Sequence, residues 1–198
     1  MERDELAAAL HHASHLTGSF RLRSGRTATE YFDKYRFESD PRILREIAEH
    51  AAALVPAGTE VLAGLELGGI PVATAMSLAT GLPVVFVRKA AKEYGTRRLA
   101  EGADVDGRSV LVVEDVVTSG GQVALSTSEL RAIGARIDHA LCVVDREEGG
   151  AEALADSGVG LISVFTAETL RTAGLAPHPS VSASTPTTSS HARRACRG

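Results

Sequence analysis

The chain has 198 residues, enough to bury one substantial hydrophobic core, and 44% of them are hydrophobic, as is typical of a globular protein. With 21 Lys and Arg against 25 Asp and Glu the net charge is −4, so no basic field favours nucleic acid or an anionic membrane surface. The acidic N-terminus, the lack of a long apolar run and the presence of only two cysteines argue against a signal peptide, a membrane span and a disulfide framework, and we expect a cytoplasmic protein.

The N-terminal part combines a helix with an irregular stretch. Residues 4–16 have helical character and include His11, His12 and His15, whose spacing places them on one helix face. No nearby carboxylate or cysteine completes a set of metal ligands, so we interpret the histidines as part of a partly exposed amphipathic helix. The stretch that follows is irregular up to a second expected helix, at about residues 41–54.

From residue 60 onward, short apolar runs alternate with segments of helical period. The runs that predict strands are residues 60–64, 83–88, 109–114, 138–144 and 160–165. Between them, residues 69–81 and 121–135 have helical character, and Gly134 is placed as a helix C-cap. Continuously apolar strands that alternate with helices predict an α/β fold with a parallel sheet covered on both faces. In such sheets ligands bind at the carboxyl ends of the strands.

The last 22 residues differ in composition from the rest. They are rich in Ser, Thr and Pro and contain no acid. Such a segment cannot bury enough apolar surface to offset its chain entropy. We therefore predict one folded domain over residues 1–176, with an N-terminal part of about 1–40 and a core of about 41–176, followed by a disordered tail over 177–198.

The third predicted strand leads directly into acids, hydroxyls and glycines. Glu114 and Asp115 are placed at its end and "TSGG" opens the next helix, so backbone N–H groups and the hydroxyls of Thr118 and Ser119 face one crevice. The glycines allow close approach to phosphate oxygens, and the carboxylates can accept hydrogen bonds from sugar hydroxyls. The pattern predicts a site for a ribose 5-phosphate. An ordinary strand–turn–helix junction is the alternative. A P-loop is excluded because no Lys follows the glycines, and a dinucleotide-binding motif is excluded because the pattern G-x-G-x-x-G is absent.

The segment "VLVVEDVVTSGGQ" resembles the diphosphoribosyl-binding motif of the type I phosphoribosyltransferases, in which two acids, two spacers, Thr, a small residue and Gly follow an apolar strand. The resemblance implies that Glu114 and Asp115 contact the ribose hydroxyls of phosphoribosyl diphosphate and serve catalysis. It also implies that the following loop binds the 5-phosphate through Val116, Val117, Thr118, Ser119, Gly120, Gly121 and Gln122.

The segment "VRKAAKEYGTRRLAEG" resembles the mobile lid loop of orotate phosphoribosyltransferases, and we call residues 88–98 the lid loop. The resemblance implies that Arg88, Lys89, Lys92 and Tyr94 bind the diphosphate, with Lys92 taking part in catalysis. Cations there can neutralise the charge that grows on the diphosphate as the glycosidic bond breaks. A solvated charged hairpin is the alternative interpretation.

The segment "FRLRSGRTATEYFDKY" resembles the N-terminal hood of the same enzymes, and "VVDREEGG" resembles a strand end whose Arg meets the orotate carboxylate. These matches imply that orotate is bound by Arg23, Tyr31, Phe32, Thr118 and Arg146. Aromatic side chains offer a stacking surface to a flat base, and an arginine can pair with a carboxylate through two hydrogen bonds. The segment "GLELGGIP" lacks the Tyr-Lys pair that some members place before Gly-Ile-Pro.

Taken together, the resemblance implies an orotate phosphoribosyltransferase with a type I phosphoribosyltransferase-like parallel sheet, an N-terminal hood and a mobile lid. It would make orotidine 5′-phosphate from orotate and phosphoribosyl diphosphate. The resemblance further implies Mg²⁺ held mainly through the substrate, and a homodimer whose lid is shared across the interface. A purine phosphoribosyltransferase would share the phosphate loop but lack the lid and the hood. A non-catalytic nucleotide-binding regulator on the same fold would lose lid cations or gain a basic face.

Overall fold

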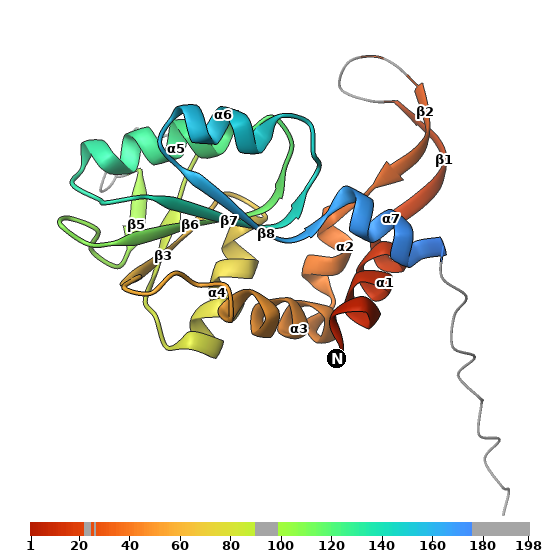
Figure 1. The fold of residues 1–198 in the computed structure, drawn as a ribbon, viewed down its shortest axis with the longest axis horizontal. Helices are drawn as coiled ribbons and strands as arrows, with labels where there is room; N and C mark the ends of the chain where they lie inside the picture. The colour runs from red at the N-terminus through yellow and green to blue at the C-terminus, as the bar shows by residue number, and fades with distance from the viewer. Residues whose placement is uncertain (22–24, 26, 90–98, 176–198) are drawn as a thin grey trace, which may run out of the picture.

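The computed structural model of the chain describes residues 1–21, 25, 27–89 and 99–175 (Figure 1). Its core is a six-stranded sheet in the order β5-β4-β3-β6-β7-β8, in which every neighbouring pair is parallel except β4 with β5. The strands are β3 (Val61–Leu65), β4 (Val84–Val87), β5 (Ala100–Gly102), β6 (Val110–Val117), β7 (His139–Asp145) and β8 (Gly160–Thr166). The α/β fold with a mostly parallel sheet predicted from the sequence is confirmed.

Helices cover both faces of the sheet. The helices α3 (Pro41–Ala52) and α4 (Gly69–Thr80) lie on one face, and α5 (Gly121–Ala132) and α6 (Gly150–Asp156) lie on the other (Figure 1). Successive residues of β6 alternate between the two layers: Leu111 packs with the α3 and α4 side, and Val112 packs with the α5 and α6 side. Burial on both faces is the reason that these strands read as continuous apolar runs.

The N-terminal part forms a small unit beside the core. It comprises α1 (Arg3–Ser14), β1 (His15–Arg21), β2 (Thr27–Phe32) and α2 (Lys34–Ser39). The strands β1 and β2 pair antiparallel in a hairpin that projects away from the main sheet (Figure 1), and α1 packs against α7 (Ala167–Leu175). Our expectation of an irregular stretch after α1 was wrong. The hairpin is mostly exposed on both faces, so it lacks the alternation of apolar and polar residues that signals a half-buried strand.

The predicted strands and helices of the core match the observed ones closely, with one correction that matters for function. The strand β6 does not end at Glu114 but continues through the acid pair to Val117, and Val116 and Val117 still pair with β7. Two further apolar residues after the acids keep the chain in the sheet. Gly134 lies one residue after Ile133, the C-cap of α5, and its φ of 97° suits a glycine at that position. The predicted tail lies outside the described residues.

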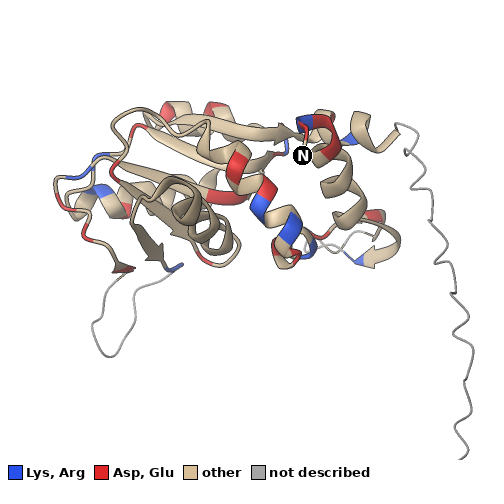
Figure 2. Ribbon diagram, turned by 90° about the horizontal axis from the view of Figure 1, so that it is seen from below, with Lys and Arg blue, Asp and Glu red and all other residues tan. Residues whose placement is uncertain are grey.

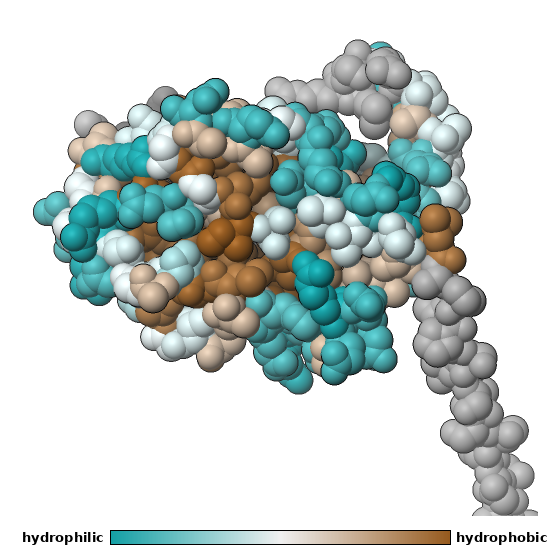
Figure 3. All heavy atoms as spheres, viewed as in Figure 1, coloured by the Kyte–Doolittle hydropathy of each residue, from teal (hydrophilic) through white to brown (hydrophobic). Residues whose placement is uncertain are grey.

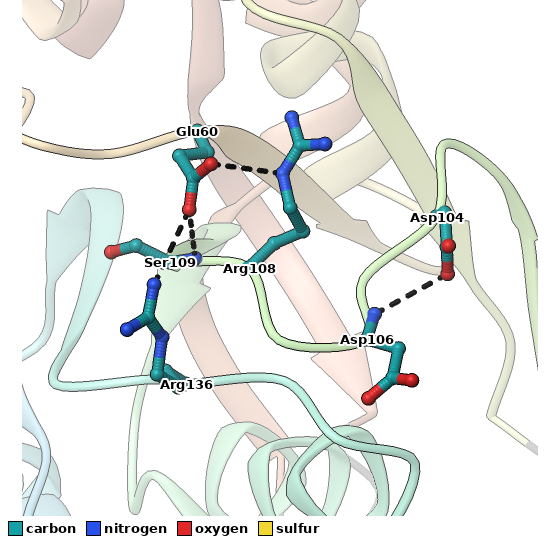
Figure 4. A network of polar contacts seen from close by, with 6 residues as sticks. All are labelled: Glu60, Asp104, Asp106, Arg108, Ser109 and Arg136. Carbon is teal, nitrogen blue, oxygen red and sulfur yellow. Dashed lines mark hydrogen bonds and ion pairs between the residues drawn. The ribbon is translucent and has the colours of Figure 1, made fainter.

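The amino-terminal edge of the sheet is joined by a polar network around Glu60 (Figure 4). Its carboxylate accepts a hydrogen bond of 2.8 Å from the Ser109 backbone N–H and forms ion pairs with Arg108 at 3.0 Å and Arg136 at 3.5 Å. The Ser109 hydrogen bond and the two guanidinium groups hold the pKa of Glu60 below its usual value. This network ties the start of β3 to the start of β6, at the edge opposite the carboxyl ends of the strands.

Candidate active site

The carboxyl end of β6 opens into a pocket built mainly of backbone and small side chains. Its volume is about 180 Å³, and it is lined by Glu114 and residues 116–123, which include the whole predicted phosphate loop. Gly120 is the N-cap of α5 with a φ of 73°, and a Cβ there would lie 2.9 Å from the Gly150 carbonyl oxygen. The first N–H groups of a helix have no partner within the helix and carry partial positive charge, so this pocket suits a phosphate.

The two acids of β6 face different surroundings. Glu114 lines the phosphate pocket, whereas the Asp115 side chain is fully buried on the side of α2. The Oδ1 of Asp115 accepts a hydrogen bond of 2.7 Å from the Val116 backbone N–H. Its Oδ2 lies 2.6 Å from the Nζ of Lys34, the first residue of α2. The structure therefore joins Asp115 to the N-terminal unit.

A third carboxyl group lies beside this ion pair. Glu38, one turn after Lys34 on α2, is 8% exposed, and its Oε1 has no hydrogen-bond partner among the described residues. Gly68, which precedes α4, closes the other side: a Cβ there would collide with Asp115 Oδ2 and lie 2.6 Å from Glu38 Oε1. Asp115 is thus enclosed by α2 and by the loop after β3.

The protonation of this cluster follows from burial and from mutual contact. Burial, followed by contact with Asp115, raises the pKa of Glu38 and that of Glu114 to about 9. Burial alone would raise the pKa of Asp115, but hydrogen bonds from Glu114, Glu38 and Lys34 outweigh it and lower that pKa to about 2. At neutral pH the cluster therefore holds one carboxylate, two protonated carboxyl groups and one ammonium group.

Glu38→Gln is expected to reduce the loss of stability at alkaline pH. Because the folded-state pKa of Glu38 is about 9 against an ordinary 4.5, the folded chain keeps a proton that the unfolded chain releases. This contribution is fully present below the unfolded pKa and is lost as the pH rises through the folded pKa. Gln has no proton to release, so the melting temperature should fall less between about pH 6 and about pH 9 in the variant than in the wild type. Equal falls in scanning calorimetry would contradict this protonation.

A larger cavity of about 490 Å³ lies between the hairpin, α1, α7 and the end of β7. It contains Tyr31, Phe32 and Arg146, three of the residues predicted to bind orotate. The Arg146 backbone N–H donates to the Val117 carbonyl at 2.9 Å, so a residue that lines this cavity is hydrogen-bonded to one that lines the phosphate pocket, which contains a fourth predicted residue, Thr118. The Arg146 guanidinium lies 3.2 Å from the Glu148 carboxylate. An aromatic wall with an arginine beside a phosphate pocket can hold a flat anionic base next to a sugar phosphate.

The remaining predicted residues belong to the lid loop and the hood. Arg88 and Lys89 follow β4, and the Lys89 backbone N–H donates to the Glu66 carboxylate at 3.1 Å. Arg23, Lys92 and Tyr94 lie outside the described residues. Within the described part of the chain, no three His, Cys, Asp or Glu side chains gather as a metal site would require.

Comparison with known proteins decides the family. The phosphoribosyl transferase domain model matches residues 36–168. The orotate phosphoribosyltransferase of Nocardioides sp. (strain ATCC BAA-499 / JS614) is 53% identical over 161 residues, which cover 81% of this chain and 90% of that protein. This chain belongs to the orotate phosphoribosyltransferase family.

Solved orotate phosphoribosyltransferase structures from Mycobacterium tuberculosis H37Rv are similar in fold. The complex with Fe(III) dicitrate is 36% identical with a TM-score of 0.78, and the complex with 5-phospho-α-D-ribosyl 1-diphosphate is 32% identical with a TM-score of 0.74. Both matches cover 85% of this chain and 98% of the other chain. The resemblance inferred from the motifs is confirmed at the level of the family and the fold.

Three residues that surround Asp115 were not among the predicted site residues: Lys34, Glu38 and Gly68. The spacing of Lys34 and Glu38 places both on one face of a helix, which is the local signal that was present. No feature of the neighbouring sequence indicates that Lys34 and Glu38 contact Asp115, which lies about eighty positions later. His11, His15 and Arg171 also line the large cavity without having been predicted, because the packing of α1 against α7 brings them there.

Proposed function

We propose that this chain transfers the 5-phosphoribosyl group from phosphoribosyl diphosphate to orotate, giving orotidine 5′-phosphate and diphosphate. The observation that carries the proposal is the backbone hydrogen bond that links the linings of the two cavities, from the Arg146 N–H to the Val117 carbonyl. A phosphate in the loop pocket and a base in the aromatic cavity would present the sugar between them.

Different residues of the site then have different roles in the reaction. The loop over residues 116–122 holds the 5-phosphate, and Arg146 pairs with the orotate carboxylate. As the bond from the sugar to diphosphate breaks and the bond to the pyrimidine nitrogen forms, positive charge develops on the ribose beside Glu114 and Asp115. Arg88, Lys89 and Lys92 offset the charge of the departing diphosphate. Positioning and electrostatics suffice, and no covalent nucleophile is required.

Mg²⁺ is proposed as the cofactor, held mainly through substrate oxygens. The described carboxyl groups at the site suit this arrangement, because Asp115 is already paired with Lys34 and Glu114 favours its protonated form. When bound, Mg²⁺ would supply charge compensation to the diphosphate, as is usual for this hydrated cation at phosphate substrates.

We further propose a cytoplasmic homodimer whose lid loop closes over the partner's site. Figure 3 shows apolar residues across the middle of one face, and Leu78 of α4 is 86% exposed, which supports association through the surface. In the view of Figure 2, acidic residues accompany the basic ones across the described ribbon, which gives no support to nucleic acid as a partner. None of the described helices is long and apolar enough to cross a membrane.

The test is consumption of orotate, followed by its absorbance, with phosphoribosyl diphosphate and Mg²⁺. Uracil, hypoxanthine and adenine should not be turned over. Arg146→Ala should raise KM for orotate about 10- to 100-fold, the value of a charge-assisted hydrogen bond, with little change in KM for phosphoribosyl diphosphate. Arg45→Ala, which removes an exposed arginine of α3, is the matched control. Turnover of a purine without turnover of orotate would favour the purine phosphoribosyltransferase alternative.

A further inference from the structure

The N-terminal unit reaches the sugar end of the site through α2, whose Lys34 contacts Asp115. We propose that Lys34 of α2 is a positioning residue, which keeps the Asp115 carboxylate ionised and fixed in orientation so that it can serve the ribose. The inference rests on the proposed function, because that function gives Asp115 its role beside the sugar. According to this proposal, the hood orients a residue that serves the phosphoribosyl group, in addition to the residues that it contributes to the binding of the base.

Two short contacts help to hold the Asp115 carboxylate in place, in addition to the hydrogen bonds from Glu114 and Glu38. One oxygen accepts from the Val116 N–H at 2.7 Å, and the other lies 2.6 Å from the Lys34 ammonium. The Asp115 side chain is fully buried, and Lys34 is the one cation within ion-pair distance of it among the described residues. The position that a Cβ of Gly68 would occupy overlaps Asp115 Oδ2, so the loop after β3 leaves this carboxylate little room to turn away.

Among the described residues, Lys34 is the cation that contacts Asp115, and hydrogen bonds from Glu114 and Glu38 lower the pKa of Asp115 as well. Glu114 precedes it on β6, and Glu38 faces it from α2, where Asp33 adds negative charge near Glu38. Cys142 of β7 is a buried thiol whose pKa is raised by burial first, and which also lies within the field of Asp115. Removing the ammonium group takes away one of the three hydrogen-bonding groups that lower the pKa of Asp115, so the effect of burial is less opposed.

Lys34 itself is placed for this role. Burial lowers its pKa, but contact with Asp115 outweighs burial and leaves the pKa raised, so the ammonium form persists. Its Nζ also lies 5.3 Å from the centre of the Tyr35 ring. The Lys34 side chain is 33% exposed, and its Nζ contacts the fully buried carboxylate of Asp115. A lysine of this kind links a solvent-facing helix to the interior of the sheet.

Lys34→Met is expected to lower kcat/KM for phosphoribosyl diphosphate by about tenfold or more, while KM for orotate changes little. Loss of the ammonium group raises the pKa of Asp115, so the remaining activity of the variant should rise with pH across the neutral range. In the wild type, where Asp115 is already ionised, its titration should cause no such rise. Lys34→Arg, which restores a cation, should recover part of the loss. Arg36→Met, which removes an exposed cation two residues later on α2, should behave as the wild type.

A double-mutant cycle separates positioning from direct substrate contact. If Lys34 acts through Asp115, then Lys34→Met should cost nothing further in a chain that already carries Asp115→Asn, both in kcat/KM and in calorimetric binding of phosphoribosyl diphosphate. The double variant leaves no unpaired buried charge, so it remains usable even where Lys34→Met alone folds poorly. An additional loss in the Asp115→Asn background would overturn the proposal, since Lys34 would then touch the substrate itself.

A uniform loss in Lys34→Met at every pH, with no rescue by arginine, would also overturn the inference and leave Lys34 a purely structural role. Wild-type kinetics in Lys34→Met would do the same. Failure of the proposed function has a different signature, because the wild-type enzyme would then not consume orotate at all. In that case the calorimetric cycle with phosphoribosyl diphosphate still tests the link between Lys34 and Asp115.

Discussion

Gly69→Ala is expected to cause a severe loss of folded protein. Gly69 is the first residue of α4, and a Cβ there would collide with the Val113 carbonyl oxygen of β6. That strand is hydrogen-bonded to β3 on one side and β7 on the other, so its backbone cannot move aside. We expect a loss of about 3 kcal/mol or more in the free energy of unfolding, a large share of the total for a domain of this size.

The measurement for Gly69→Ala is the midpoint of urea unfolding, with Gly81→Ala as the matched control at the other end of the same helix. Gly81 has a φ of 76° but no atom near the position of a Cβ, so that variant carries conformational strain alone, about 1–2 kcal/mol. Similar midpoints for the two variants would show that β6 and α4 can separate at low cost.

Mixing two inactive variants is expected to restore activity if the lid loop is shared between subunits. Lys92→Ala removes a lid cation and Arg146→Ala removes the base anchor, so at orotate concentrations below the wild-type KM each homodimer should be nearly inactive. In a heterodimer one site has both defects, while the other combines an intact Arg146 with the partner's intact lid. With random exchange half of the dimers are mixed, and recovery should approach roughly a quarter of the wild-type activity per chain.

Subunit exchange must first be verified, for example by mass-tagged chains in native mass spectrometry. Once exchange is established, an absence of recovery would mean that each chain closes its own site or that Lys92 is not a lid residue that acts in catalysis. An elution volume of a monomer in size-exclusion chromatography would contradict the proposed dimer directly.

The pocket at the end of β6 could be predicted because the residues that line it follow one another in the chain. The acids, hydroxyls and glycines of residues 114–121 follow one another, and the strand–turn–helix geometry that uses them is set over a few residues. The same reasoning placed the acids at the end of the strand, whereas β6 continues to Val117. Buried carboxyl groups inside a strand need a partner, and here the partner comes from outside the motif.

The contacts between the N-terminal unit and the core could not be predicted, because they depend on tertiary packing. The hairpin of β1 and β2 buries little on either face and leaves no periodic signal. Lys34 meets Asp115 only after α2 has docked at the end of β6. The sequence of a short polar helix does not indicate which strand the helix will pack against.

The ends of the lid loop are fixed to each other by the main sheet. Val87 of β4 pairs with Ala100 of β5, and the Arg88 N–H donates to the Leu99 carbonyl at 2.9 Å. Because these hydrogen bonds already bring the two ends together, doubling the length of the intervening segment costs only about 0.6 kcal/mol of additional closure entropy. A change in the length of the chain between Arg88 and Leu99 should therefore leave the register of the six-stranded sheet unchanged.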